Sequence, residues 1–500
     1  MRAMHAMRRR EQGQALVLAM VCMVVFVVGV LVLFNTGQVV NKKVQLNNTA
    51  DAAAYSAAVQ QARAYNLIAY LNRAQVANEV ATAQIVSIHS WMNFAISGTD
   101  HFAKAVQGLG IALDLTGVGA EVGVELNEIG LQLSEVKDTM QKVRDTMKGV
   151  FSAVVTGLSL ANVAYAKVGQ AITTVEIGDI PTLVRTVVEQ NTIKAAGSTD
   201  KAARLSAVSY GVLAMQAKAA NRGYARLYEV PNSHSPSSNP HPTADADRYA
   251  NVVMEARDGF SASRDGNELF LHKRGGTDLV SYNRWVAMDT LNASASIVGL
   301  DLPMAWGGAA AVSRTSGAAF ANLSDPDHGW TSPYDNDAGH YDPYGGARTN
   351  DSAGNQARLH PATPSNDAAL LSGYQGLQSY EDIAANKAIV PYSENETPDD
   401  GPVFSVLVEQ PMSDVRTTSN VEGIGGPPDL TVPDKAQNNN MTALASAQVY
   451  FDRPRMLAAF RRADDHRELG NLFSPYWQAR LVETPRSVKL EIFGADAAGL

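Results

Sequence analysis

Residues 15–34 read ALVLAMVCMVVFVVGVLVLF, twenty consecutive positions without one charged side chain. Twenty predominantly apolar residues are about the length that a helix needs to cross the hydrocarbon core of a bilayer. The stretch is too long for the apolar core of an ordinary cleaved signal peptide, and no small-residue cleavage site follows it. We therefore predict a transmembrane helix at 15–34. The alternative is a buried core helix of a soluble protein.

Basic residues flank this stretch unequally. Arg2 and the run RRR at 8–10 precede it, whereas the pair KK at 42–43 follows it. Because positive charge is enriched on the cytoplasmic side of membrane helices, we expect residues 1–14 to form a cytoplasmic tip. The chain from residue 35 onward would then lie outside the cytoplasm.

Proline divides the remaining chain. The first 180 residues contain none, and Pro181 is the only one before Pro231. Proline in a helix interior costs about 3 kcal/mol, so the first half can be mostly helical and the second half cannot. We expect a mostly helical stalk at 35–230 and an α+β domain with long loops at 231–500.

Within the stalk, we expect the membrane helix to continue, with breaks, through residues 39–96 and to end at Gly98. Further helical segments are expected at 151–176, 181–195 and 200–228. Between them lies an unbroken heptad seam, within a region 122–154 that has the pattern of a coiled coil. The seam consists of Leu126, Ile129, Leu133, Val136, Met140, Val143, Met147 and Val150. It favours an intramolecular helical hairpin, and self-association through the same residues is the alternative.

The second half reads as an irregular domain with a small antiparallel sheet. Short runs with strand-like composition are ELFLHK (268–273), PVFSVLVEQ (402–410), ALASAQVYF (443–451) and QARLVE (478–483). An acidic loop, DPDHGWTSPYDND, lies between the first two. Flexible acidic loops can bind calcium, but Asp, Asn and Gly also form ordinary surface turns, which we favour. The calcium candidates are Asp325, Asp327, Asp335 and Asp337.

Motifs of enzyme chemistry are missing from the sequence. It contains no phosphate-binding Walker loop, no complete dinucleotide fingerprint, no Gly-x-Ser-x-Gly elbow and no His-Glu-x-x-His pair. The net charge of −9 gives no basic surface for nucleic acid, and the single cysteine, Cys22, lies inside the apolar stretch. We expect a non-enzymatic protein without catalytic residues or a cofactor.

The N-terminal residues carry a family resemblance. The basic run at 8–10, then Gly13 and Gln14, then the apolar helix, form its first part. Its second part is an alanine-rich patch after the basic pair at 42–43. The patch consists of Thr49, Ala50, Asp51, Ala52, Ala53 and Ala54. Positions 8–58 thus resemble the N-terminal module of TadG-like proteins of the Flp (tight-adherence) pilus assembly system.

The resemblance implies a role in assembling Flp-type pili from the bacterial inner membrane, with most of the chain in the periplasm. Contacts with the bilayer and with other pilus-assembly proteins follow from that role, through Gly13, Gln14 and the patch. Two departures matter. Leu18 stands where a processed pilin would carry Glu, which favours a permanent anchor over cleavage after Gly13. The metal motif Asp-x-Ser-x-Ser of many TadG-like proteins is missing. The alternative function is a membrane-tethered periplasmic module that binds or senses a ligand.

Overall fold

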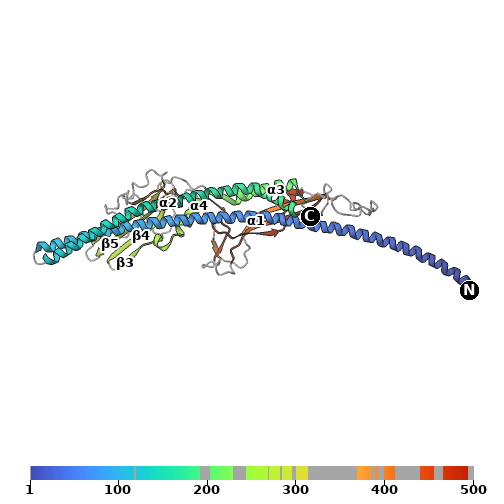
Figure 1. Cartoon of the computed structure of the whole chain (residues 1–500), viewed down its shortest axis with the longest axis horizontal. Helices are drawn as coiled ribbons and strands as arrows, with labels where there is room; N and C mark the ends of the chain where they lie inside the picture. The colour runs from blue at the N-terminus through green and yellow to red at the C-terminus, as the bar shows by residue number, and fades with distance from the viewer. Residues whose placement is uncertain are drawn as a thin grey trace.

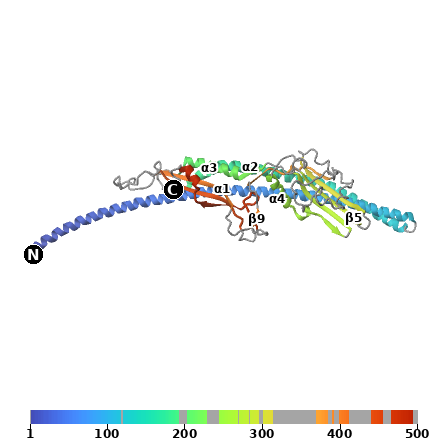
Figure 2. The same cartoon turned by 180° about the vertical axis from the view of Figure 1, so that it is seen from behind.

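Two long helices run side by side along the molecule, and the sheets lie against them (Figure 1). Helix α1 spans Arg2–Thr116, and helix α2 returns in the opposite direction over Ala120–Asn191. The N-terminal part of α1 projects beyond the other described elements as a lone helix (Figures 1 and 2). The computed structural model describes residues 2–116, 120–191, 203–228, 244–268, 270–281, 284–295, 300–313, 369–383, 389–391, 399–411, 440–454 and 466–493.

Both helices are longer than the sequence pattern indicates. The predicted breaks within 39–96 and the predicted end at Gly98 are wrong, because α1 is one helix that continues to Thr116. A Cβ atom on Gly98 would lie 3.2 Å from the Cβ of Ala305, so this glycine admits a neighbouring strand. Helix α2 passes through Pro181 and joins the segments predicted at 151–176 and 181–195.

The segment 200–228, for which the sequence predicts helix, is only partly helical. It contains two short strands, an α-helix and a turn of π-helix. These are β1 (Arg204–Leu205), α3 (Ala207–Ala219), η1 (Ala220–Tyr224) and β2 (Ala225–Tyr228). Ser206 caps α3, where its hydroxyl accepts a hydrogen bond of 3.0 Å from the Ser209 amide.

A proximal lobe packs on α1 soon after the lone helical part. Its four-stranded antiparallel sheet has the order β1-β10-β11-β13. The long strands are β10 (Asp399–Pro411), β11 (Asn440–Phe451) and β13 (Trp477–Val482). In its core, the ring centroid of Trp477 lies 5.1 Å from that of Tyr65 on α1 and 5.2 Å from that of Phe451. These aromatic contacts fix the sheet on the helix.

A distal lobe packs further along α1. Its five-stranded sheet has the order β3-β4-β5-β6-β7, antiparallel except for the parallel pair β6–β7. The strands are β3 (Gly266–Glu268), β4 (Leu271–Ser281), β5 (Arg284–Ala295), β6 (Leu300–Val312) and β7 (Leu370–Leu371). Helices α4 (Ala244–Glu255) and α5 (Gly259–Ala262) lie beside it. Trp285, Tyr249 and Tyr374 are fully buried in the core of this lobe.

Two small strand pairs and a last helix complete the described fold. The pairs join β2 to β8 (Tyr380–Ile383), and β9 (Ile389–Pro391) to β12 (His466–Glu468). Helix α8 covers Arg486–Phe493. The predicted strands at 402–410, 443–451 and 478–483 are confirmed. The predicted strand at 268–273 is wrong as one strand, because a turn at Phe270 divides it between β3 and β4.

Candidate membrane anchor and assembly site

The apolar segment at 15–34 lies on the part of α1 that projects from the body. Its large side chains are exposed, from 37% at Val28 to 73% at Leu33, apart from the half-buried Leu31. Exposure all round the helix distinguishes it from a buried core helix, whose apolar side chains would be covered. Within the part of the chain that the structure describes, two helical segments are long and apolar enough to cross a membrane, Ala15–Leu115 within α1 and Glu121–Val175 within α2. The apolar window of the first has none of its residues buried.

The folded body begins close to this segment. Leu46 is 1% exposed and belongs to the proximal core, about 18 Å along the helix from Phe34. Between them, the Lys43 ammonium donates a hydrogen bond to the Thr442 carbonyl of β11. Burial lowers the pKa of Lys43. The apolar segment and the folded body therefore lie on one continuous helix, and only a short stretch of that helix separates them.

The alanine-rich patch lies where α1 enters the proximal lobe. Ala50, Ala53 and Ala54 are fully buried, whereas Asp51 points to solvent. Thr49 is also buried, and its hydroxyl donates to the Gln45 carbonyl at 2.9 Å. Small side chains at this spacing allow the strands of the proximal sheet to approach the helix closely. Gly13 and Gln14 lie in the lone part of α1.

Amide side chains on α1 extend this contact by bonding to the main chain of the lobes. Asn66 both accepts from the Trp477 amide and donates to the Trp477 carbonyl, each at 2.9 Å. Asn72 donates to the carbonyls of Glu381 and Leu472, each at 2.7 Å. Asn93 donates to the Gly308 carbonyl of β6 at 2.9 Å. Buried backbone groups need such partners, so these side chains set where each lobe sits on the helix.

The heptad seam of α2 is divided between two environments. Its first set, Leu126, Leu133, Met140 and Met147, is half-buried. This set faces α1, as the 3.9 Å contact between the Thr99 hydroxyl and the Met140 sulfur shows. Its second set is exposed, namely Ile129, Val136, Val143 and Val150 at 46–51%. Self-association through the seam stays a prediction, for which the second set offers apolar surface.

A buried carboxylate joins both long helices to the distal sheet. Glu79 of α1 accepts hydrogen bonds from the Trp285 indole at 2.9 Å and the Tyr374 hydroxyl at 2.8 Å. Asn162 of α2 donates a third, at 2.9 Å. Burial raises the pKa of Glu79, while the three donors favour its ionised form. These hydrogen bonds hold α1, α2, β5 and the segment that carries Tyr374 together. The carboxylate is buried and has no access to a substrate.

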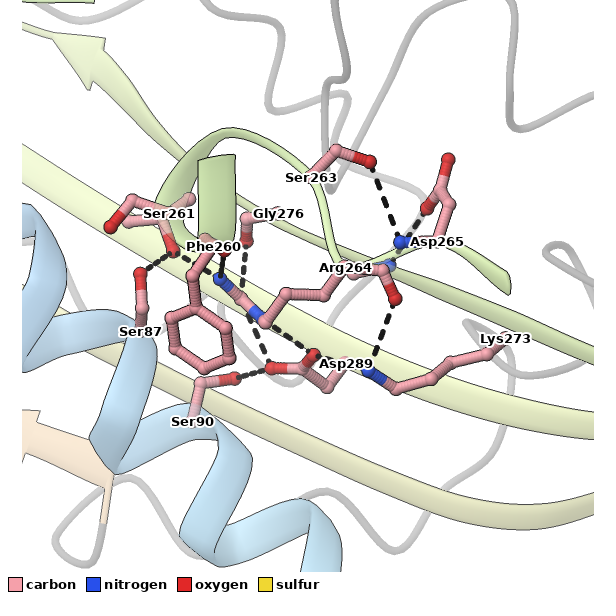
Figure 3. A network of polar contacts seen from close by, with 12 residues as sticks. Ser87, Ser90, Phe260, Ser261, Ser263, Arg264, Asp265, Lys273, Gly276 and Asp289 are labelled. Carbon is pink, nitrogen blue, oxygen red and sulfur yellow. Dashed lines mark hydrogen bonds and ion pairs between the residues drawn. The ribbon is translucent and has the colours of Figure 1, made fainter. Parts of the chain in front are cut away.

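A second buried network ties the distal sheet to α1 (Figure 3). Arg264 forms a bidentate pair with Asp289 of β5, and Ser90 of α1 donates to the same carboxylate at 2.7 Å. The Arg264 guanidinium also donates to the Gly276 carbonyl at 3.0 Å. Lys273 lies at the edge of the network, 3.7 Å from Asp289, and burial lowers its pKa. Every group here bonds within the protein, which indicates a structural role.

Neither network follows from the sequence pattern. One signal was available for Glu79, since it is the only Asp, Glu, Lys or Arg between Arg73 and Asp100. Among the described residues, no group of three or more His, Cys, Asp or Glu side chains could hold a metal ion. The calcium candidates Asp325, Asp327, Asp335 and Asp337 lie outside the described residues.

The exposed apolar segment and the helical body are consistent with a membrane-anchored protein in which a sheet-bearing body is built along a helical rod. Residues 13–61 match the model of the Tad family, described as Flp pilus-assembly TadE/G-like. The match confirms the resemblance seen at 8–58: the N-terminal part of the chain carries a TadG-like module. It supports a role related to Flp pilus assembly. No curated protein and no solved structure matches the chain.

Proposed function

We propose that this protein is a non-enzymatic, membrane-anchored structural component of a Flp/Tad-type pilus assembly apparatus. One apolar helix at 15–34 would hold it in the bacterial inner membrane, with residues 1–14 in the cytoplasm and the body in the periplasm. The observation that carries the proposal is the position of the Tad match. Residues 13–61 cover both the exposed apolar segment and the buried patch by which the body is fixed to it.

The structure suggests how such a component would work. Because α1 is continuous from the apolar segment into both lobes, the body keeps a fixed position relative to the membrane. Contacts with other assembly proteins would then occur on the exposed surface of the rod, and no turnover is needed. The burial of Ala50, Ala53 and Ala54 supports a role of the patch in holding the body on the anchor.

Deleting the gene and counting surface pili tests this role. We expect few or no pili while the pilin itself is still made, with recovery when the full chain is restored. As a matched pair, Val24→Glu with Val28→Glu should release the chain from the membrane and fail to restore pili. Val24→Leu with Val28→Leu, which keeps the exposed segment apolar, should restore them. Normal piliation of the deletion strain would refute the proposal.

The mass of the mature protein tests permanent anchorage separately. A chain that keeps the residues before Gly13 agrees with an anchor, and Leu18 predicts this result. A mature N-terminus at Gln14 would show that a peptidase processes the chain as it would a pilin.

A further inference from the structure

The far end of the helical hairpin projects past the distal sheet (Figure 1). Near the edge of that sheet, the ring nitrogen Nδ1 of His101 on α1 lies 3.0 Å from the Met304 carbonyl oxygen of β6. Beyond His101, α1 runs to Thr116 and α2 returns from Ala120. We name residues 102–116 and 120–131 the hairpin end. It extends about 20 Å beyond His101.

Large apolar side chains of the hairpin end face outward. Leu115 is 83% exposed, and the others are about half exposed. The set comprises Phe102, Leu109, Ile111, Leu115, Val122, Val124, Ile129 and Leu131. Soluble proteins that act alone rarely leave so many apolar side chains together on one small element.

Glycine explains why these side chains point away from the partner helix. A Cβ atom on Gly110 would lie 2.7 Å from the Gly123 carbonyl oxygen, and one on Gly123 would lie 2.8 Å from that of Gly110. A Cβ atom on Gly130 would lie 3.0 Å from the Ala103 carbonyl oxygen. The two helices thus pack backbone to backbone. The larger residues, which would fill the interface of an ordinary soluble hairpin, are left on the outside.

Charge on the hairpin end is mostly negative. Its only basic residue is Lys104, which pairs with Asp100 at 2.7 Å. Its acidic residues are all exposed, namely Asp114, Glu121, Glu125 and Glu128. An apolar element that carries exposed acidic side chains is complementary to an apolar surface that carries basic ones.

The same charges disfavour the other candidate occupants. A hydrocarbon interior would have to accept four acidic side chains. A lipid surface is usually bound through a polar face rich in Lys and Arg, whereas the hairpin end carries Lys104 and four acidic residues. Copies anchored in one membrane would share their orientation, so the acidic side chains of their hairpin ends would lie close together and repel. This last point rests on the proposed anchorage.

We propose that the hairpin end is the docking site for a second protein whose contact surface is apolar with Lys or Arg at its edge. About 120 Å of helix separates Phe34 from Thr116, so the contact lies far from the membrane that holds the anchor. The partner is a different protein, and the exposed apolar side chains of the hairpin end supply the contact.

Photo-cross-linking in intact cells tests the proposal with the full chain. Benzoylphenylalanine would replace Leu115 or Val124 at the hairpin end, and Val175 as a control of similar exposure elsewhere on α2. We expect the first two positions to give an adduct with one protein. Mass spectrometry should map the adduct to an apolar peptide that contains Lys or Arg. The Val175 position should not give this adduct.

Charge reversal sharpens the test. The pair Glu125→Lys and Glu128→Lys should lower the adduct yield about tenfold, because the basic edge would then be repelled. Glu189→Lys, at an exposed position far along α2, should leave the yield unchanged. Protease resistance of each variant checks that it is folded.

Several outcomes would overturn the inference. They are an adduct of the chain with itself, an adduct with lipid, no adduct, or a yield that charge reversal does not change. Membrane fractionation and pilus counts on the same strains separate this failure from that of the proposed function. If neither the Leu115 nor the Val124 position gives an adduct while anchorage and piliation are normal, the docking site alone is refuted.

Discussion

The guanidinium of Arg264 and the carboxylate of Asp289 form two parallel hydrogen bonds, Nε to Oδ1 at 2.8 Å and Nη2 to Oδ2 at 3.1 Å. Both side chains are almost fully closed to solvent, at 2% and 0% exposed. Ser90 of α1 completes the carboxylate's set of donors (Figure 3). The pair therefore holds the distal sheet at one position on the helix.

Removing one member of this pair should be costly. Arg264→Ala leaves the Asp289 carboxylate buried without its bidentate arginine partner. We expect it to lower the free energy of unfolding by about 3–5 kcal/mol. Lys104→Ala, which breaks an ion pair whose lysine is 68% exposed, should cost less than about 1 kcal/mol. Urea unfolding of the full chain in detergent, followed by tryptophan fluorescence, compares the two. Equal midpoints would contradict the structural role of the network.

Gly307 of β6 should not tolerate a side chain. A Cβ atom there would overlap with the amide nitrogen of Phe94 and the carbonyl oxygen of Ser90, both backbone atoms of α1. We expect Gly307→Ala to destabilise the protein by about 1–3 kcal/mol, because strand and helix must separate. Gly157→Ala is the control, since a Cβ atom at this position of α2 would have no neighbouring atom within 4 Å. It should stabilise the helix by about 0.5–1 kcal/mol. If both variants shift the unfolding midpoint in the same direction, this account is refuted.

The two sets of the α2 seam should respond differently to truncation. Leu133→Ala removes part of the contact with α1 and should cost about 1–2 kcal/mol. Val136→Ala changes a side chain that is 50% exposed and should cost less than about 0.5 kcal/mol in the isolated chain. Chemical unfolding at low protein concentration measures both. A cost at Val136 that grows with protein concentration would show that the exposed set binds a second copy.

Glu381 should make stability depend on pH. Burial raises the pKa of its carboxyl from 4.5 to about 7, partly offset by the hydrogen bond that Thr173 donates at 3.3 Å. The folded state therefore binds this proton more tightly than the unfolded state. The stability that the protonated Glu381 carboxyl contributes is present at low pH and is lost as the pH rises from 4.5 to about 7.

Glu381→Gln keeps the hydrogen-bond acceptor and removes the titration. We expect it to reduce the fall in stability between pH 5 and pH 8 by up to about 3 kcal/mol. Glu483→Gln, at a side chain that is 91% exposed, is the control and should leave the pH profile unchanged. Unfolding midpoints across this range provide the measurement. If Glu381→Gln leaves the pH profile unaltered, water reaches the Glu381 carboxyl and burial does not raise its pKa.

Patterns that repeat along the chain predicted much of the architecture. The apolar run at 15–34, the heptad seam and the alternating strand VFSVLV in 402–410 each depend on neighbours nearby in sequence. The distal sheet was predicted at 268–273 alone. Its strand β6 was missed because it contains WGGAAAV, a sequence with poor strand propensity. Its small residues are explained only by the helix that presses against Gly307.

The contacts around the anchor were predictable only in part. The family resemblance located the alanine-rich patch, but the packing of Ala50 and Ala53 depends on strands far along the chain. Glu79 shows the same limit, since its donors are 83, 206 and 295 residues away. Spacing within a helix cannot indicate such distant partners.

The continuity of α1 also fixes a rotational phase between the membrane and the body. Each residue of an α-helix turns the chain by about 100°, so adding one residue at Gly37 would rotate the apolar segment by that angle relative to the proximal core. Adding seven residues would restore the facing to within about 20° while lengthening the interval by about 10 Å. The number of residues between the apolar segment and the proximal core therefore sets both the direction that the body faces and its height above the bilayer. One added residue changes mainly the direction, and seven change mainly the height.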